Sequence, residues 1–319
     1  SRRAPVTLSD ANAEFDGADR LRASGIDLDL GGHSEDVFAD ADLAVVSPGV
    51  PFDLPVLEGL RRRGVPVIGE LELAWRWLRG RVIAITGTKG KSTTTTLTGR
   101  MLQAAGLPAV VGGNIGTALS AQVDASTPDT LHVVEVSSFQ LEAADTFHPW
   151  IAVLMNFSAD HLDRHGSIES YGSAKARIFA RQTAGDWAVV NADDEGAARL
   201  AQSSAARRFD FSRSARIGEG IVVENGSVTR RRDGQSEPLL PLSSIRLLGP
   251  HLVDDVLAAA AVGSLVGVAP AVMQQAIEDF HGLEHAVEPV EVLGHVQFDN
   301  DSTKSSMSMA RLFLGWSAA

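Results

Sequence analysis

Short apolar runs alternate with helical patterns along most of the chain. In its first part, the apolar runs lie at residues 4–8, 41–50 and 64–69. Between the last two, residues 53–64 carry apolar positions at helical spacing and end on a glycine, which predicts a helix. Short strands that alternate with helices are typical of βαβ units and of a parallel sheet. Since the pattern restarts at residue 81, we expect a domain boundary near Gly69.

A second and longer series of apolar runs follows. These runs lie at residues 81–87, 108–116, 130–138, 149–158 and 186–195. Helical patterns at residues 91–106 and 170–182 separate some of them, so we predict an open, doubly wound parallel sheet. Asn225 and Gly226 stand between two further apolar runs and predict a β-hairpin over residues 220–231.

The composition restricts the class of protein. With 319 residues, of which 44% are hydrophobic and 21% charged, the chain is long enough for at least two packed domains. Its formal net charge of −12 argues against binding to nucleic acid or to an anionic membrane. The absence of cysteine excludes disulfides and thiolate metal ligands and fits a cytoplasmic protein. The longest apolar run, residues 256–269, is too short to span a bilayer.

The stretch VIAITGTKGKSTTTTL, residues 82–97, has the strand, glycine turn and helix of a phosphate-binding loop. Gly87 and Gly90 allow backbone amides to turn toward a phosphate, and the start of the helix adds partial positive charge. Ile85 replaces the first glycine of the usual loop, so we interpret this stretch as a shortened variant. The alternative is an ordinary strand-to-helix turn.

Side chains with phosphate and metal chemistry accompany this loop. Lys91 would reach the β- and γ-phosphates of a nucleotide, and Ser92 or Thr93 would hold Mg²⁺. Glu135 ends an apolar predicted strand, at the edge where α/β sheets bind ligands, and carboxylates are ligands that Mg²⁺ prefers. A surface glutamate at a strand end is the alternative.

Taken in order, these motifs resemble those of the Mur ligases and folylpolyglutamate synthases. GTKGKST is similar to their GT-x-GK-[ST] loop, and further segments match in order: VGGNIGTAL, VVEVSSFQLE, NFSADHLDRHGSIESYGSAKARI, NADDE and GPHLVDDVLAAAA. The resemblance covers nearly the whole chain. SSFQLE and GGNIG are most similar to the branch that joins D-glutamate to UDP-N-acetylmuramoyl-L-alanine.

The resemblance implies an ATP-dependent, ADP-forming ligase of peptidoglycan precursor synthesis. ATP would phosphorylate a substrate carboxylate, and an amine would then attack the acyl phosphate to give an amide. The implied cofactors are ATP and Mg²⁺ at two sites. The implied partners are the small molecules UDP-N-acetylmuramoyl-L-alanine and D-glutamate, and the expected protein is a cytoplasmic monomer.

The resemblance also assigns nucleotide and metal residues. His161 would bind a second Mg²⁺, and Lys175 matches a lysine that the family carbamoylates, which would make it an oxygen ligand. Together with Lys91 these two would be the catalytic residues; the alternatives are a loop or helix-cap histidine and a solvated lysine. The nucleotide would be bound by Gly87, Thr88, Gly90, Lys91, Ser92, Thr93 and Asp301. The metal ligands would be Ser92, Glu135, His161 and Lys175.

A further set of residues would face the muramoyl substrate. By resemblance these are Ser47, Gly49, Asn114, Ser137, Ser138, Gln140 and Arg164. Ser47 and Gly49 belong to an SPG turn that would meet the uridine diphosphate, and Arg164 would contact the substrate carboxylate or the phosphates. As residue types, Asn114, Ser137, Ser138 and Gln140 are equally typical of turns and strand-end caps, and Arg164 of an exposed helix face.

The resemblance divides an α/β fold into three parts. Residues 1–69 would be a partial Rossmann-like domain that binds the UDP-linked substrate, and residues 70–282 a central doubly wound P-loop ATPase domain. Residues 283–319 would begin a third α/β domain that binds the amino acid. We expect the chain to be part of a longer protein, because the first strand of the family fold and most of the third domain lie outside it.

Four departures from the family pattern concern the nucleotide. They involve Lys89, Leu252 with Asp255, Ala286 and Thr303, where the family usually has asparagine, two asparagines, arginine and lysine. Loss of the arginine would remove a charge-assisted contact of roughly 1.5–3 kcal/mol. The departures leave three hypotheses: the D-glutamate ligase, another Mur or folylpolyglutamate-type ligase, and a catalytically weak nucleotide-binding paralogue.

Overall fold

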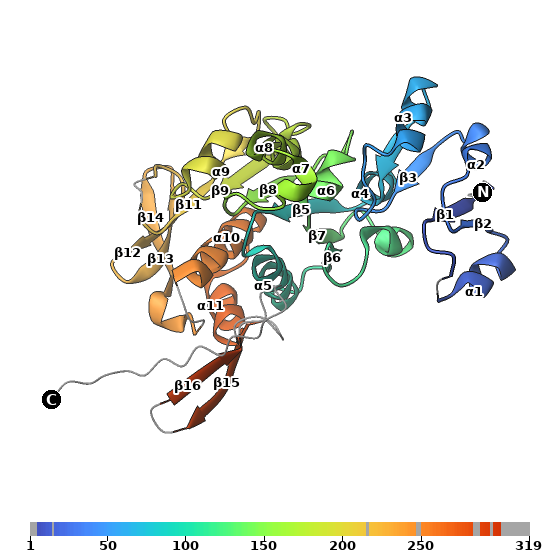
Figure 1. Ribbon diagram of the computed structural model, residues 1–319. Coiled ribbons are helices and arrows are strands. Elements are labelled where there is room, and N and C mark those ends of the chain that lie inside the picture. The colour runs from blue at the N-terminus through green and yellow to red at the C-terminus, as the bar shows by residue number, and fades with distance from the viewer. Residues whose placement is uncertain are drawn as a thin grey trace.

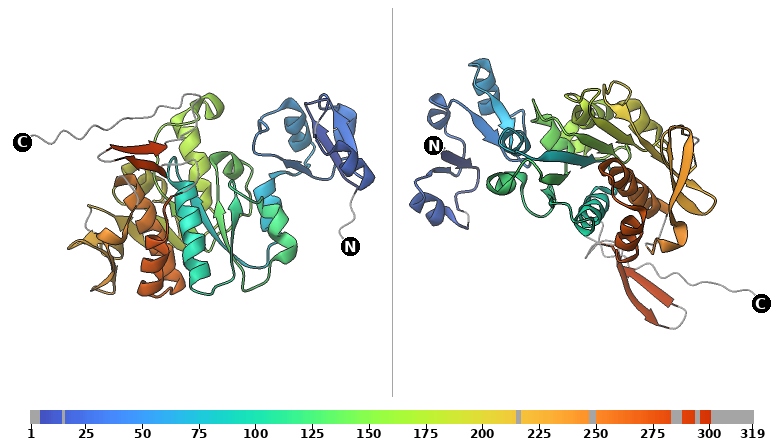
Figure 2. Two further views of the ribbon diagram at one scale, coloured as in Figure 1. Left: turned by 90° about the horizontal axis from the view of Figure 1, so that it is seen from below. Right: turned by 180° about the vertical axis from the view of Figure 1, so that it is seen from behind.

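The computed structural model describes residues 5–14, 16–214, 217–246, 250–282, 288–293 and 296–300. An N-terminal part lies at one end of the molecule, beside a larger part built around one parallel sheet (Figure 1). Both views of Figure 2 show the same separation. The α/β fold predicted from the sequence is confirmed.

Two βαβ units form the N-terminal part. Its elements are β1 (Thr7–Asp10), α1 (Ala18–Ala23), β2 (Asp27–Leu30), α2 (Glu35–Ala39), β3 (Ala44–Val46), α3 (Pro55–Arg62) and β4 (Val67–Gly69). β1 pairs in parallel with β2, and β3 pairs in parallel with β4. Leu57 and Leu60 of α3 share a core cluster with Ala44 and Val46 of β3, which accounts for the helical spacing of apolar residues.

Two sequence-based details of this part were wrong. β3 ends at Val46 because the Pro-Gly turn begins directly after it, so the strand is shorter than the apolar run at residues 41–50. The sequence analysis also does not predict β2, whose sequence DLDL has no β-branched residue to mark it.

A six-stranded parallel sheet forms the centre of the larger part. Its strands are β5 (Arg81–Thr86), β6 (Ala109–Gly113), β7 (Leu131–Glu135), β8 (Ile151–Leu154), β9 (Trp187–Val190) and β10 (Arg207–Arg208). Their order is β10-β9-β8-β5-β7-β6, and every pair is parallel. The helices around them are α4 (Glu70–Trp75), α5 (Lys91–Ala104), η1 (Leu119–Ala125), α6 (Ser138–Glu142), α7 (Leu162–His165), α8 (Ile168–Ala176), η2 (Arg177–Phe179) and α9 (Glu195–Leu200).

A smaller mixed sheet and two helices follow. They comprise β11 (Asp210–Ser212), β12 (Gly220–Glu224), β13 (Ser227–Arg232), β14 (Gln235–Pro241), η3 (Leu242–Ser244), α10 (Pro250–Val266) and α11 (Pro270–Glu278). The predicted hairpin is confirmed: β12 and β13 are antiparallel, and the turn residues Asn225 and Gly226 have φ of 50° and 73°. A last antiparallel pair is β15 (Glu288–Leu293) with β16 (Val296–Asn300).

Alternate residues of the central strands belong to two different cores. In β5, Ile83 and Ile85 lie in the core with α5, α10 and α11, whereas Val82 and Ala84 lie in the core with α4 and α6. Figure 1 shows these helices on opposite faces of the sheet. Because both faces are buried, the strands need apolar residues at every position, which explains their continuous apolar runs.

The order of the strands creates a switch point between β5 and β8. The chain leaves β5 toward β6 on one side, and it leaves β8 toward β9 on the other. In open α/β sheets, ligands bind outside the carboxyl ends of the strands at such a point. We therefore expect a ligand site among the residues that follow β5, β7 and β8. Among the described residues, no helix is both long and apolar enough to cross a bilayer.

Candidate active site

The phosphate-binding loop connects β5 to α5 at the switch point. Gly90 has φ of 80° and caps the N-terminus of α5, a conformation that L side chains rarely adopt. A Cβ on Gly87 would lie 2.8 Å from the Cβ of Met155, so the loop also passes too close to β8 for a larger residue. Ile85, in place of the usual first glycine, is fully buried in β5. The turn therefore begins later than in the usual loop.

Asn156 holds this loop in place. Its Oδ1 accepts hydrogen bonds from the backbone N–H of Thr88 at 3.0 Å and of Lys89 at 2.8 Å, and its Nδ2 donates to the Lys89 carbonyl at 3.1 Å. Asn156 was not predicted from the sequence as a site residue. Its signal was its position near the end of a buried strand, at the same sheet edge as the loop.

Glu135 joins two segments of the site. It is 2% exposed, and its two carboxylate oxygens accept hydrogen bonds from Ser92 Oγ at 2.6 Å and from Asn114 Nδ2 at 2.7 Å. The alternative of a surface glutamate is thus wrong. The structure brings together three residues that the sequence analysis selected, one from each of three segments.

Lys175 lies beneath the loop. It is 1% exposed, its Nζ donates a hydrogen bond to the Gly87 carbonyl at 2.8 Å, and its Nζ is 4.8 Å from the centre of the Tyr171 ring. Burial and the charge of Lys91 lower the pKa of Lys175 to about 7, against the opposite effect of Asp160 and Glu135. The alternative of a solvated lysine is wrong, because the amine is buried and partly neutral at neutral pH.

His161 has a different setting. It is a non-glycine residue with φ of 51°, and it precedes the short helix α7. Its half-exposed ring lies 5.1 Å from the ring of Phe139, and its Nε2 lies 3.6 Å from Asp160 Oδ2. Its ring also lies 6.4 Å from the ring of Tyr171 on α8, which Lys175 contacts. The role of His161 as a metal ligand stays a prediction.

Oxygen donors near the loop fit a magnesium ion held jointly with phosphates. The described residues contain no group of three or more His, Asp and Glu side chains placed to hold a metal by themselves. The hydroxyl of Ser92 and the carboxylate of Glu135 are nevertheless in contact at the start of α5. Mg²⁺ usually takes one or two protein oxygens and completes its shell with phosphates and water. This pair of residues suits that pattern.

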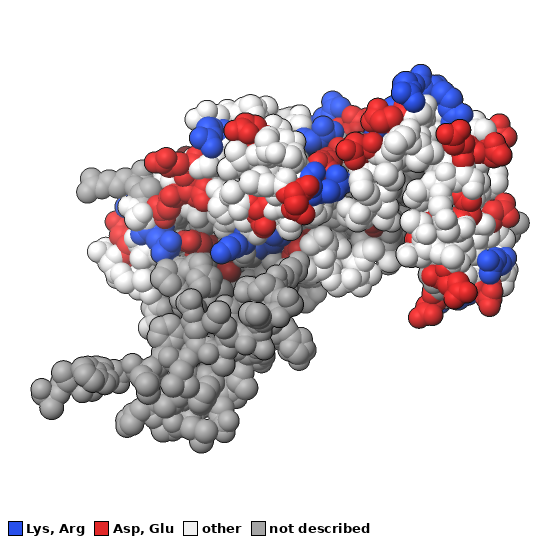
Figure 3. All heavy atoms as spheres, viewed as in Figure 1, with Lys and Arg blue, Asp and Glu red and all other residues white. Residues whose placement is uncertain are grey.

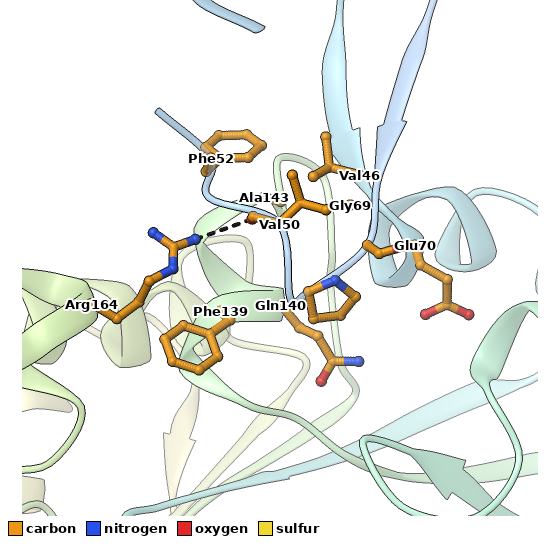
Figure 4. Close-up of a pocket in the computed structure, with 11 residues that line it drawn as sticks. Val46, Val50, Phe52, Gly69, Glu70, Phe139, Gln140, Ala143 and Arg164 are labelled. Atoms are coloured by element: carbon orange, nitrogen blue, oxygen red, sulfur yellow. Dashed lines mark hydrogen bonds between the residues drawn. The ribbon is translucent and has the colours of Figure 1, made fainter. Parts of the chain in front are cut away.

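A pocket lies between the N-terminal part and the central part (Figure 4). Its lining includes Ser47 from the turn after β3, Gln140 from α6 and Arg164 from α7. Arg164 donates a hydrogen bond to the Val50 carbonyl at 3.2 Å, across the two parts. Gly49 lies in the same exposed turn as Ser47 but is not among the lining residues.

The serines of α6 have structural contacts of their own. Ser137 accepts a hydrogen bond from the Gln140 N–H at 3.2 Å, and Gln140 Oε1 accepts one from the Ser137 N–H at 3.0 Å, which makes a capping box. Ser138 Oγ lies 2.9 Å from Nε2 of the buried His165. The capping box of Ser137 and Gln140 was not predicted from the sequence, and a substrate role for the three residues stays a prediction.

The departures from the family pattern have different positions. Leu252 and Asp255 are both buried in α10, at 7% and 2% exposure, and Asp255 lies against the phosphate loop. Lys89 is exposed in the loop itself. Asp301, Ala286 and Thr303 lie outside the described residues.

Charged side chains of both signs are mixed over the face in Figure 3. Several charged side chains of the described residues are partners of one another, such as Arg208 with Asp210 at 2.8 Å and Arg213 with Asp254 at 2.6 Å. On this face, the visible charges do not form one extended basic surface of the kind that a phosphate backbone requires.

Comparison with known proteins decides the family. Residues 85–263 match the profile of the Mur ligase middle domain, and residues 1–69 match that of the Mur ligase MurD-like, N-terminal domain. The UDP-N-acetylmuramoylalanine–D-glutamate ligase of Acidobacterium capsulatum is 47% identical over 315 residues, which are 97% of this chain and 68% of that protein. The chain belongs to the Mur ligase family. A second relative of the same name, from Koribacter versatilis, is 41% identical over 307 residues, 95% of this chain and 68% of that protein.

Solved structures of Mur ligases share the fold. The UDP-N-acetylmuramate:L-alanyl-gamma-D-glutamyl-meso-diaminopimelate ligase of Neisseria meningitides has a TM-score of 0.59 at 19% identity, over 87% of this chain and 91% of that chain. A pseudomurein peptide ligase type C from Methanothermus fervidus has a TM-score of 0.54 at 20% identity, over 93% of this chain and 69% of that chain. The multi-domain α/β architecture of Mur ligases is therefore the architecture of this chain.

Proposed function

We propose that this chain is the substrate- and nucleotide-binding portion of an ATP-dependent, ADP-forming ligase that adds D-glutamate to UDP-N-acetylmuramoyl-L-alanine. The observation that carries the proposal is the meeting of a phosphate loop, a buried carboxylate and a buried amine at one sheet edge. Relatives named for this reaction, 47% and 41% identical, support the choice of substrates. The reaction would proceed through an acyl phosphate and serve peptidoglycan synthesis.

The nucleotide phosphates would lie over the loop. The amides at the start of α5 are unpaired within the helix and carry partial positive charge, so they would bind the β-phosphate. Lys91, whose Nζ now donates to the Thr88 carbonyl at 3.1 Å, would turn toward the phosphates. Thr88, Thr93 and Asp301 complete the set that we assign to the nucleotide.

Ser92 and Glu135 would hold a magnesium ion beside the phosphates. When bound, Mg²⁺ would neutralise charge on the phosphoryl group in transfer. We further propose that Lys175 is carbamoylated and, with His161, serves a second Mg²⁺. Its lowered pKa supports this, because only the neutral amine can attack carbon dioxide.

The muramoyl substrate would bind where the N-terminal part meets the central part, beside the small pocket that Ser47 and Gln140 line. Ser47 and Gly49 would meet its uridine diphosphate, while Asn114, Ser138 and Gln140, with Ser137, would line the path toward the loop. Arg164 would bind a carboxylate or phosphate, since a guanidinium offers planar paired donors for either group. A nucleotide-linked substrate and ATP are cytoplasmic metabolites, so we propose that the protein works there, as a monomer.

We infer three domains from these roles. Residues 1–69 would bind the UDP-linked substrate, residues 70–282 would bind ATP, and residues 283–319 would begin the domain that binds D-glutamate. The separate core of the N-terminal part supports the first boundary. The chain spans 68% of the length of the relative from Acidobacterium capsulatum, so the test requires the full-length protein.

The test measures ADP release with MgATP, UDP-N-acetylmuramoyl-L-alanine and either D-glutamate or L-glutamate. We expect release that needs both the muramoyl substrate and D-glutamate. Release with other substrates only would indicate another ligase of the family. ATP binding without turnover would favour the catalytically weak paralogue. Leu252 and Asp255 in α10 make this paralogue the main alternative hypothesis.

A further inference from the structure

A carboxyl group lies directly behind the phosphate loop. Asp255, in the second turn of α10, is 2% exposed, and Thr94 Oγ1 of α5 donates a hydrogen bond to its Oδ1 at 3.3 Å. A Cβ on Gly90 would lie 2.2 Å from the same oxygen. Asp255 therefore touches the glycine that turns the loop into α5, on the side away from solvent.

The surroundings of Asp255 favour its neutral, protonated form. Burial raises the pKa of its carboxyl well above 3.8, the negative charge of Asp254 raises it further, and the hydrogen bond from Thr94 opposes both effects. Asp254 itself is paired with Arg213 at 2.6 Å. The other charged residues on the helices and strands packed against α10 are Lys91 and Arg100 on α5, Asp210 on β11, Glu224 on β12, Arg230, Arg231 and Arg232 on β13, and Glu278 on α11.

The position of this group matters for a loop that binds phosphates. Phosphates at the start of α5 would bring negative charge to the opposite side of Gly90. An ionised Asp255 would repel this charge from its buried position behind Gly90, where electrostatic interactions are stronger than in water. A protonated Asp255 has the size and polarity of asparagine and causes no such repulsion.

We propose that Asp255 is a positioning residue of the phosphate loop that must hold a proton when nucleotide binds. This inference rests on the proposed nucleotide site. When the carboxyl is ionised, binding of the phosphates takes up one proton from solvent onto Asp255. Nucleotide affinity consequently falls as pH rises through the range in which Asp255 loses its proton, by at most tenfold per pH unit for one linked proton.

The test compares ADP binding to the full-length wild-type protein, Asp255→Asn and Asp254→Asn over the whole pH range in which the three proteins stay folded. We expect the dissociation constant of the wild type to rise with pH by up to about tenfold per unit more than that of Asp255→Asn. Asp254→Asn, which removes a neighbouring charge outside the loop, should keep the extra slope. Titration of Lys175 and of ADP is common to all three proteins and cancels in the comparison.

Two further measurements test the same proposal without relying on the affinity of a variant. Calorimetry of the wild type in buffers of different ionisation enthalpy counts the protons taken up with ADP, so a poorly folded variant does not end the experiment. Thermal unfolding without nucleotide should show the wild type losing stability relative to Asp255→Asn as pH rises. The reason is that the carboxyl ionises freely in the unfolded chain, whereas the buried carboxyl keeps its proton to higher pH in the folded protein.

Failure has two distinguishable forms. Parallel pH profiles for the wild type and Asp255→Asn, with ADP bound by both, would overturn this inference and leave the nucleotide site intact. An absence of ADP binding by all three proteins would overturn both the inference and the proposed function.

Discussion

Lys175 on α8 donates a hydrogen bond from its amine to the carbonyl of Gly87, the first residue of the turn after β5, at 2.8 Å. The two residues are 88 positions apart in the sequence. This contact joins the C-terminal end of α8 to the backbone of the phosphate loop. The amine is buried and lacks the hydration of an exposed lysine, which is the main reason that its pKa is lowered to about 7.

Replacement of Lys175 by methionine should abolish turnover while lowering the stability of the fold only slightly. Met fills a similar volume without a buried charge, and the unpaired Gly87 carbonyl costs about 1–3 kcal/mol. We therefore expect a folded protein whose melting temperature falls by only a few degrees at pH 7, but whose ADP release is lost. Arg199→Met, which removes an exposed charge on α9, is the control. Turnover close to that of the wild type in Lys175→Met would contradict the proposed role.

Gly90 should tolerate alanine far worse than Gly106 does. Both have positive φ, 80° and 75°, but a Cβ at Gly106 meets nothing within 4 Å, whereas at Gly90 it meets Asp255 at 2.2 Å. Gly106→Ala should cost about 1–2 kcal/mol of unfolding free energy and leave ADP binding unchanged. Gly90→Ala should cost about 1–3 kcal/mol more through overpacking, and should weaken ADP binding as the loop shifts.

Chemical denaturation and ADP titration on the two alanine variants provide the comparison. Equal losses of stability at the two positions would show that Asp255 moves aside without cost. Unchanged ADP affinity in Gly90→Ala would count against this loop as the phosphate site.

Both the oxygen and the nitrogen of the Asn156 side-chain amide should contribute to nucleotide binding. Asn156→Ala removes the acceptor for the N–H groups of Thr88 and Lys89, so the loop loses its anchor to the segment that follows β8. Asn156→Asp keeps the acceptor but loses the donor to the Lys89 carbonyl and adds a negative charge beside the phosphates. We expect ADP binding to weaken about tenfold or more in both, and more in the aspartate variant. Isothermal titration at low and high salt checks this, since only the charge effect should shrink with salt.

Much of the fold could be predicted from local patterns. The strands buried on both faces have continuous apolar runs, and the turn at Asn225 and Gly226 needs positive φ, so each element carries its own signal. The four-stranded sheet around this hairpin was less visible. β11 has only three residues and pairs in parallel with β12, a contact that depends on where the larger sheet places it.

Site residues that belong to a sequence motif could be predicted, whereas residues whose role depends on tertiary contacts could not. The loop, Glu135 and Lys175 were found by residue order, and the structure brings them to one sheet edge. Asn156 and His165 were not found, because an asparagine after a strand and a histidine at a helix end are common. Their importance comes from partners 67 and 27 residues away, which a linear pattern does not contain.

Glu72 fastens α4, the first helix after the N-terminal part, to the segment that precedes β8. It is fully buried, and its Oε2 accepts hydrogen bonds from the backbone N–H groups of Asp145, Thr146 and Phe147 at 2.9, 2.9 and 3.0 Å. Its Oε1 accepts one from Arg76 Nε at 2.8 Å. Burial alone would raise the pKa of Glu72, but these hydrogen bonds, with one from the Thr146 hydroxyl, lower it below 4.5.

Replacement of Glu72 by glutamine should therefore destabilise the protein, and the loss should depend on pH. At pH 7 we expect a loss of about 1.5–3 kcal/mol, because an amide nitrogen would face N–H donors. Since the folded pKa lies below the ordinary value, the carboxylate contributes fully above about pH 4.5, and its contribution is lost as pH falls through the folded pKa. The difference between wild type and Glu72→Gln should thus narrow below pH 4.5. Denaturant unfolding from pH 3 to pH 7 measures it, with Glu195→Gln, an exposed residue on α9, as the control; a difference constant with pH would mean that Glu72 is not held as a carboxylate.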